Sequence, residues 1–161
     1  MQSKSADETR AIGATLGRLL HPGDVVMLHG DLGSGKTTLT QGIAKGLGID
    51  EVVQSPTFTL VAEHDGQTPA GERLTLYHLD LYRLDDPDEL ESLGYEDLVR
   101  QRDSVVVVEW PERAGGILPD DYLLIGIEPS DPGERVLAIQ AFPPDGQARS
   151  LLDRLQKAAE T

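Results

Sequence analysis

Hydrophobic residues follow a helical period in the N-terminal third of the chain. Ile12, Leu16, Leu19 and Leu20 fall at i, i+4, i+7 and i+8, which places them on one face of a helix. Residues 5–8 have capping-box spacing and mark its start, and the turn residues 21–24 mark its end. A second helix is predicted over residues 37–47, closed by Gly48.

Continuous apolar runs at residues 25–28 and 105–108 predict strands that are buried on both faces. Further strands are expected at residues 57–63, 74–79, 122–128 and 135–142, with turn-rich connectors at 65–71 and 129–133. Asp86 as N-cap with Pro87 at the first helical position predicts another helix start, and residues 150–159 predict a final helix.

This order of elements predicts an α/β sandwich, a single domain built on a mixed, partly parallel sheet. The length of 161 residues suits one domain. The expected core spans about residues 5–142, and residues 143–161 form a C-terminal tail with a helix.

Composition narrows the classes of function. The net charge of −14 repels a nucleic-acid backbone, which argues against direct, high-affinity nucleic-acid binding by this chain alone. The acidity favours a solvated surface, with a basic protein partner as the alternative. The chain has no cysteine, which excludes thiolate metal sites and fits a reducing cytoplasm. No apolar run approaches the ~18 residues of a membrane span, and residues 1–7 lack the apolar stretch of a secretory signal.

The segment Gly30-Asp31-Leu32-Gly33-Ser34-Gly35-Lys36-Thr37 matches the phosphate-binding pattern G-x-x-x-x-G-K-[ST] in full. It lies between a predicted strand and a predicted helix, as the motif requires. Its glycines let backbone N–H groups surround phosphate oxygens, Lys36 supplies a positive charge, and the Thr37 hydroxyl is a suitable Mg²⁺ ligand. Thr38 is expected to pack on the helix or to contact the α-phosphate. The pattern predicts a P-loop protein that binds a nucleotide with Mg²⁺.

Two acidic residues are candidates for the second metal ligand. Glu109 follows the apolar run at 105–108, and Asp80 follows the run at 74–79. Carboxylates at the carboxyl ends of strands lie where open α/β sheets bind ligands. Either residue could hold Mg²⁺ or orient the attacking water, and the pattern leaves both assignments open.

Three other features have weaker meanings. Residues 54–60 stand where GTPases carry a loop that senses the γ-phosphate, but a Ser-Pro turn before a strand explains them equally well. Trp110 is the only tryptophan and is expected either at the edge of the core or in the wall of the site. His29 and His78 are most simply polar residues near strand ends, and neither receives a role.

Four segments together resemble the bacterial TsaE family, also called YjeE. They are Gly30 to Thr38, Ser55-Pro56-Thr57-Phe58-Thr59-Leu60-Val61, His78-Leu79-Asp80-Leu81-Tyr82-Arg83-Leu84 and Val108-Glu109-Trp110-Pro111-Glu112-Arg113. The likeness covers roughly residues 5–142. The phosphate-loop pattern is shared by many families, and the other three segments make the resemblance specific.

The resemblance implies a P-loop ATPase required for threonylcarbamoyladenosine synthesis at tRNA position 37. It implies Thr37 and Glu109 as Mg²⁺ ligands, Asp80 as a carboxylate linked to hydrolysis, and residues 55–60 as the switch segment. It also implies ATP contacts from a larger set: Gly33, Ser34, Gly35, Lys36, Thr37, Thr38, Arg113 and, near the adenine, Arg135.

The same resemblance implies two partner proteins, TsaB and TsaD, of which TsaD carries the transfer chemistry. tRNA would then be held by the partners and would meet this chain only indirectly. Two other functions fit a P-loop: a small-molecule kinase, which usually carries an arginine-rich lid, and a nucleotide sensor without turnover. Arg100 and Arg102 are the closest approach to such a lid.

Overall fold

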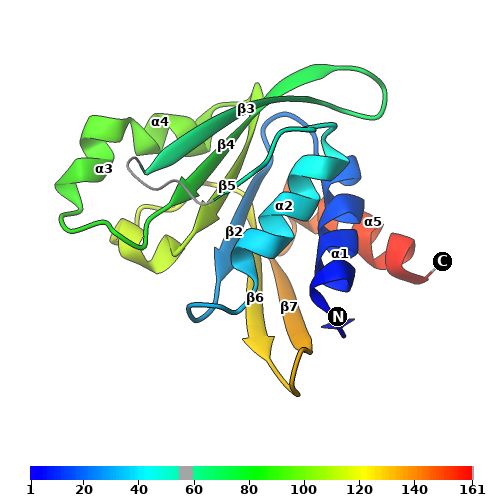
Figure 1. Ribbon diagram of the computed structural model, residues 1–161. Coiled ribbons are helices and arrows are strands. Elements are labelled where there is room, and N and C mark those ends of the chain that lie inside the picture. Colours follow the sequence, from blue (N-terminus) through cyan, green and yellow to red (C-terminus); the bar gives the residue numbers. More distant parts are fainter. Residues whose placement is uncertain (55–59, 161) are drawn as a thin grey trace.

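The computed structural model describes residues 1–54 and 60–160, and Figure 1 shows their arrangement around one twisted sheet. The sheet has seven strands in the order β1-β7-β6-β2-β5-β4-β3. The strands are β1 (Gln2–Ser3), β2 (Val25–His29), β3 (Val61–Gln67), β4 (Arg73–Asp80), β5 (Ser104–Glu109), β6 (Tyr122–Pro129) and β7 (Arg135–Phe142). The helices are α1 (Ala6–Leu19), α2 (Lys36–Gly46), α3 (Asp88–Leu93), α4 (Tyr95–Arg100), the 3₁₀ turn η1 (Pro111–Ala114) and α5 (Gln147–Glu160).

The sheet is mixed, which confirms the predicted fold class. β2 runs parallel to both β5 and β6, and β4 runs parallel to β5. The pairs β3–β4, β6–β7 and β1–β7 are antiparallel. The parallel strands therefore occupy the centre, where both faces are covered, and the antiparallel strands lie toward the edges.

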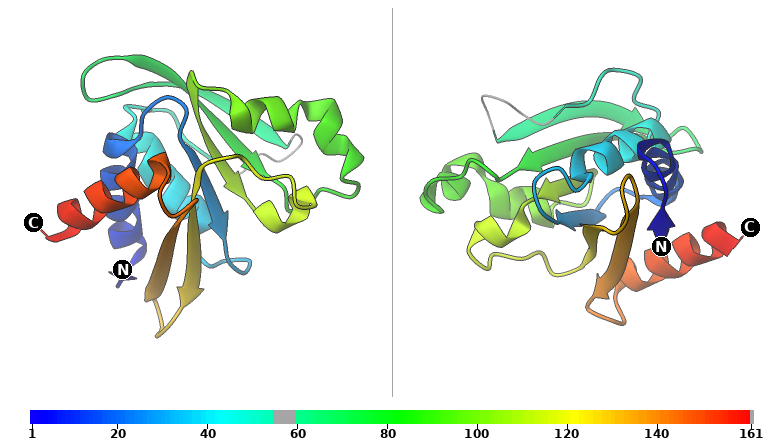
Figure 2. Two further views of the ribbon diagram at one scale, coloured as in Figure 1. Left: turned by 180° about the vertical axis from the view of Figure 1, so that it is seen from behind. Right: turned by 60° about the horizontal axis from the view of Figure 1, so that its bottom comes forward.

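Helices cover both faces of the sheet (Figures 1 and 2). One core cluster joins Val26 and Leu28 to buried residues of α1, α2 and α5. The second joins Val25 and Met27 to buried residues of α3, α4 and η1. Successive side chains of β2 thus enter opposite layers, which explains its uninterrupted apolar sequence.

The predicted first helix is confirmed with its cap. The Ser5 hydroxyl accepts a hydrogen bond from the Glu8 N–H (3.1 Å), as the capping box requires. The Glu8 carboxylate in turn accepts from the Lys4 N–H (2.6 Å). One free amide group at the exposed start of α1, the Glu8 N–H, therefore has a side-chain partner.

The connector expected at residues 65–71 is shorter than predicted. β3 continues to Gln67, which pairs with Arg73, and the turn is closed by the Gly71 N–H on the Thr68 carbonyl (2.9 Å). Gly66 suggested a turn but has another reason to be glycine, because a Cβ there would lie 2.8 Å from the Leu47 carbonyl oxygen. This strand needs glycine for a close approach to the end of α2.

The helix start predicted at Asp86 is displaced by one residue. Pro87 is the N-cap of α3, and the Asp86 carboxylate still accepts the Asp88 N–H (3.0 Å). Gly94 has a positive φ of 71° and ends α3 before α4 begins.

The hydrophobic core extends beyond residues 5–142. Helix α5 buries Ala148, Leu151, Leu152 and Leu155, which join the cluster under α1 and α2. The short strand β1, which the sequence did not predict, pairs with β7 at one edge of the sheet. Among the helices of residues 1–54 and 60–160, none is long and apolar enough to cross a membrane.

Helices α1 and α2 touch through their backbones, and glycine makes the contact feasible. A Cβ on Gly13 or Gly17 would lie 2.5 or 2.3 Å from the carbonyl oxygens of Leu39 and Ile43. On the facing helix, a Cβ on Gly42 or Gly46 would lie 2.2 or 2.3 Å from the carbonyl oxygens of Arg10 and Ala14. Since α2 begins at the phosphate loop, this contact fixes the loop's supporting helix.

We expect Gly42→Ala to destabilise the protein although alanine is the better helix former. The new methyl group meets backbone, which cannot rotate away, so the helices must separate. Such overpacking costs on the order of 1–3 kcal/mol beyond the ~1 kcal/mol gained in helix propensity. Urea unfolding followed by circular dichroism measures the free energy. Ser150→Ala, on an exposed position of α5, is the control and should change stability little; equal stability of both variants would contradict the close contact.

Candidate functional site

The carboxyl ends of three central strands meet at one edge of the sheet. Leu28 of β2 is in register with Glu109 of β5, and Glu109 is in register with Asp80 of β4. Because side chains alternate along a strand, Asp80 and Glu109 share the face that bears Leu76 and Val107, which is the face covered by α2. Both carboxylates therefore lie at the strand ends predicted from the sequence.

The phosphate loop leaves β2 at this edge and enters α2. Gly33 has a φ of 80° and Gly35 a φ of 112°, values that favour glycine, and Gly35 is the N-cap of α2. Gly30 is required by space, since a Cβ there would lie 2.5 Å from the Ile127 carbonyl oxygen. The Ser34 N–H donates to the Asp31 carbonyl (3.0 Å), which closes a turn. The backbone thus has the compact form that the motif predicts.

Lys36 is buried under this loop, with only 5% of its surface exposed. Its ammonium group donates to the carbonyl oxygens of Gly30 and Asp31 and lies 4.0 Å from the centre of the Trp110 ring. Burial lowers the pKa of Lys36, and the nearby carboxylates, Glu109 first among them, oppose this shift. The loop therefore keeps a cation at its centre in a partly desolvated place.

Thr37, Glu109 and His78 form a connected polar group beside Lys36. The Thr37 hydroxyl donates to Glu109 Oε1 at 3.2 Å and lies 3.5 Å from Oε2. His78 Nε2 contacts Glu109 Oε2. Glu109 is 2% exposed and His78 is fully buried. The sequence pattern assigns no role to His78, although its two-residue spacing from Asp80 places both on one face of the strand.

Asp80 lies at the opening of the same site. It is partly buried, and its Oδ1 accepts a hydrogen bond from the Tyr82 N–H (3.0 Å). With it, a cleft of about 390 Å³ is lined by Leu32, Gly33, Gly35, Lys36, Thr37, Thr38, Tyr82, Arg83, Glu109 and Trp110. Most of the predicted site residues are therefore neighbours in one cleft.

Trp110 belongs to the wall of this cleft. Its backbone is left-handed, with φ 60° and ψ 50°, an uncommon state for a bulky residue. Its ring lies 5.0 Å from that of Tyr82, and the Arg113 guanidinium lies 5.5 Å from the Tyr82 ring and 6.0 Å from the Trp110 ring. Arg113 thus lies at the outer side of the cleft, next to the two aromatic rings.

Arg135 approaches the phosphate loop from β7. Its Nε donates to the Ser34 carbonyl oxygen (2.7 Å), and its Nη1 donates to the Glu134 carbonyl oxygen (2.9 Å). Ser34 is 1% exposed, and its hydroxyl has no hydrogen-bond partner among the residues that the structure describes. Arg135 therefore holds the loop's backbone, and its predicted position near an adenine remains a prediction.

The oxygen ligands present suit Mg²⁺. A hydroxyl and one or two carboxylates are hard donors, and Mg²⁺ in nucleotide sites takes its other ligands from phosphates and water. Across residues 1–54 and 60–160, no group of three or more His, Cys, Asp or Glu side chains could hold a metal ion alone. Thr37 and Glu109 fit a metal that arrives with its nucleotide. Of the predicted switch segment, residues 55–59 lie outside the described residues.

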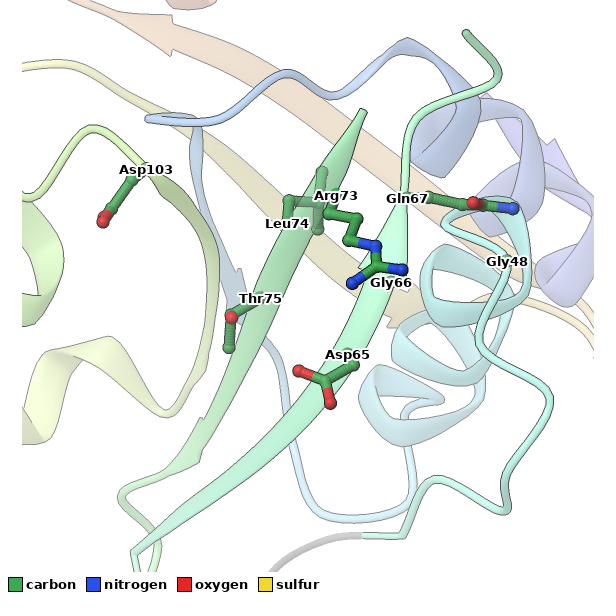
Figure 3. Close-up of a pocket in the computed structure, with 8 residues that line it drawn as sticks. All are labelled: Gly48, Asp65, Gly66, Gln67, Arg73, Leu74, Thr75 and Asp103. Atoms are coloured by element: carbon green, nitrogen blue, oxygen red, sulfur yellow. The ribbon is translucent and has the colours of Figure 1, made fainter. Parts of the chain in front are cut away.

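A larger pocket of about 650 Å³ lies near the start of β4 (Figure 3). It is lined by Gly48, Asp65, Gly66, Gln67, Arg73, Leu74, Thr75 and Asp103. Arg73, Leu74 and Thr75 begin β4, whereas Asp80 ends it, so the pocket is at the opposite end of the strand from the phosphate loop. It contains none of the residues predicted for the site.

Comparison with known proteins decides the family. The model of the family described as "Threonylcarbamoyl adenosine biosynthesis protein TsaE" matches residues 3–137. The chain belongs to the TsaE family. The resemblance based on four sequence segments is thereby confirmed.

Individual TsaE relatives align with this chain over most of their length. The chain is 41% identical to the "tRNA threonylcarbamoyladenosine biosynthesis protein TsaE" of Treponema pallidum over 137 residues, which is 85% of this chain and 96% of that protein. It is 42% identical to the protein of that name from Bacillus subtilis over 136 residues, or 84% and 80% of the two chains. The crystal structure of Bacillus subtilis YdiB superposes with a TM-score of 0.78 at 32% identity, covering 99% of this chain and 94% of that one.

In this TsaE-family chain we expect Arg135→Ala to weaken ADP binding by about tenfold, because a hydrogen bond from a charged donor is worth about 1.5 kcal/mol or more. Without it, the Ser34 end of the loop must be ordered by the nucleotide. Isothermal titration calorimetry measures the affinity. Arg149→Ala is the control, since the exposed Arg149 forms an ion pair with Asp153 within α5, away from the cleft. An affinity of Arg135→Ala within twofold of the unsubstituted protein would show that the loop needs no such anchor.

Proposed function

We propose that this chain binds ATP with Mg²⁺ in the cleft of the phosphate loop and hydrolyses it during threonylcarbamoyladenosine synthesis in tRNA. One observation carries the proposal: Lys36, Thr37, Glu109 and Asp80 converge at the end of three strands, in a protein of the TsaE family. The names of the relatives support the place of the reaction in tRNA modification.

The phosphate contacts follow from the loop. Backbone N–H groups from Gly33 to Thr38, together with the start of α2, would surround the phosphates. Lys36 would exchange its bonds to the Gly30 and Asp31 carbonyls for bonds to phosphate oxygens. Arg113 is proposed to contact the nucleotide from the aromatic side of the cleft, and Arg135 from the side of Ser34.

The two carboxylates are proposed to divide the work. Both oxygens of Glu109 already face partners, His78 on one side and Thr37 on the other, so Glu109 together with Thr37 would hold Mg²⁺. When bound, this ion offsets negative charge on the phosphates. Asp80 is more exposed, and its Oδ2 accepts no hydrogen bond within the described part of the chain. We therefore assign Asp80 to orienting the attacking water.

Partners are proposed to complete the charge stabilisation that P-loop hydrolysis needs besides Lys36 and Mg²⁺. P-loop hydrolysis commonly needs an arginine on the developing charge. Arg83 lines the cleft, and Arg113 lies beside Tyr82, so either could serve once a partner orders this wall. We propose TsaB and TsaD as these partners, in the cytoplasm, with tRNA bound by them. The net charge of −14 suits docking to a less acidic surface and not to tRNA directly.

A small-molecule kinase is the less favoured function. Arg100 and Arg102, the best candidates for an arginine lid, lie toward the end of the sheet opposite to the phosphate loop. Arg102 neighbours Gly23, which precedes β2, whereas the phosphate loop follows β2. Arg100 is paired with Glu96 in α4 (2.9 Å). Neither can cover the phosphates without a large rearrangement.

Lys36→Ala should weaken ATP binding ~30- to 150-fold. The loss of one charged contact to phosphate costs on the order of 2–3 kcal/mol, and the backbone contacts of the loop remain. Calorimetry with ATP and Mg²⁺ measures this difference. Lys45→Ala, in the last turn of the same helix, is the control and should bind as the unsubstituted protein does. A change of less than threefold for Lys36→Ala would show that phosphates bind elsewhere.

The experiment that tests the function compares ATP turnover by the isolated chain with turnover in the presence of saturating TsaB and TsaD. We expect slow hydrolysis alone and acceleration by the partners. Glu109→Ala should abolish most of the turnover while nucleotide affinity falls much less, since Lys36 and the loop stay in place. Equal rates with and without partners would mean that the isolated site is complete. Binding without turnover under all conditions would favour the nucleotide sensor instead.

A further inference from the structure

His78 is a buried polar residue that packing alone does not explain. It lies on β4 between Leu76 and Leu79, and all three are 0% exposed. Leu74 and Leu76 precede it on the same face of the strand and belong to the core beneath α2. A leucine at position 78 would continue this pattern, so the imidazole calls for a reason other than burial.

The hydrogen bonding of His78 is one-sided. Nε2 contacts Glu109 Oε2, whereas Nδ1 is buried and has no hydrogen-bond partner within residues 1–54 and 60–160. A carboxylate can only accept, so Nε2 is the nitrogen that carries a proton. Within the described residues, the hydrogen bonding of His78 is therefore directed at one oxygen of Glu109.

This contact determines how the Glu109 carboxylate is turned. Glu109 ends β5, and His78 is diagonal to it across the parallel β4–β5 pair, in register with Val107. With Oε2 held by His78, Oε1 is the oxygen nearest the Thr37 hydroxyl, at 3.2 Å against 3.5 Å for Oε2. Without His78, the Thr37 hydroxyl, which lies within 3.5 Å of both oxygens, is left to restrain rotation of the carboxylate about its last bond.

We propose that His78 is a positioning residue, which orients Glu109 so that its Oε1 and the Thr37 hydroxyl present one prearranged pair of ligands to Mg²⁺. The inference rests on the proposed function, because it needs a nucleotide-bound Mg²⁺ at this pair. Partners that orient metal ligands typically contribute 10- to 100-fold in metal affinity or activity. His78 touches neither nucleotide nor metal and acts through Glu109 alone.

Two substitutions separate positioning from packing. His78→Leu removes the donor and keeps an apolar side chain in the core. His78→Gln keeps an N–H donor at a similar reach. His64→Leu is the matched control. His64 lies on β3, outside the cleft, and its imidazole also contacts a carboxylate, that of Glu51 (2.6 Å).

The first readout is binding, measured by calorimetry with ADP over a range of Mg²⁺ concentrations. We expect the Mg²⁺ concentration for half-maximal enhancement of ADP binding to rise about tenfold in His78→Leu. ADP affinity without Mg²⁺ should stay within about twofold of the unsubstituted protein, because the loop and Lys36 are intact. The second readout is ATP hydrolysis with TsaB and TsaD, where kcat should fall about 10- to 100-fold with KM changed by less than about threefold. His78→Gln should recover most of both losses, and His64→Leu should show neither.

Normal Mg²⁺ dependence and normal kcat in His78→Leu would refute the positioning role while leaving the proposed function intact, since the unsubstituted protein is active in the same assays. Equal losses in His78→Gln and His78→Leu would refute it too and would indicate a packing role. If thermal unfolding shows that His78→Leu does not fold, His78→Gln decides: near-normal Mg²⁺ dependence supports the inference, and a tenfold loss refutes it. Absence of Mg²⁺-dependent binding and turnover in the unsubstituted protein would refute the proposed function and this inference with it.

Discussion

The parallel pairing of β2, β5 and β4 is the constraint on which the cleft depends. Parallel strands end at the same edge of a sheet, and here the register brings Leu28, Glu109 and Asp80 level with one another. The chain continues from β2 into the phosphate loop, so the loop and both carboxylates are brought together by backbone hydrogen bonds alone. A shift of register by one residue would turn each carboxylate to the opposite face of the sheet, away from α2.

Burying these charged groups has a cost that the fold offsets locally. Lys36 is surrounded by two loop carbonyls and an aromatic ring, and the nearby carboxylates oppose the lowering of its pKa by burial. Glu109 is buried between a hydroxyl and an imidazole. Such groups are poor contributors to stability when compared with apolar residues of similar size. Their presence in the core is explained by the nucleotide binding that we propose. Two further local costs lie in the same place: the left-handed backbone of Trp110 and the Ser34 hydroxyl, which has no hydrogen-bond partner in the described part of the chain.

The sequence predicted most of the fold because its signals are local. A short sequence pattern marks the phosphate loop, the apolar strands β2 and β5, and the capped helix α1. Tertiary contacts reinforce each of these patterns. Asp80 and Glu109 were found because they end apolar runs. Apart from the one-residue displacement at Asp86, the misses depend on distant contacts. Gly66 resembled a turn residue because the approach of Leu47 cannot be read from neighbouring residues. Strand β1 has two residues and exists only through β7. His78 gained a meaning only when the register placed it diagonally from Glu109.

The glycine contact between α1 and α2 completes a closed circuit of rigid parts. From Lys36 the circuit runs along α2, crosses to α1 where the backbones touch, and follows α1 back to β1. There Ser3 is paired with Arg135, whose guanidinium returns to the phosphate loop at Ser34. A mechanical linkage that closes on itself has few independent joints. The phosphate loop therefore cannot be displaced alone: a shift at Ser34 has to be shared by two helices and one edge of the sheet, and a force applied at that edge reaches the loop from both ends.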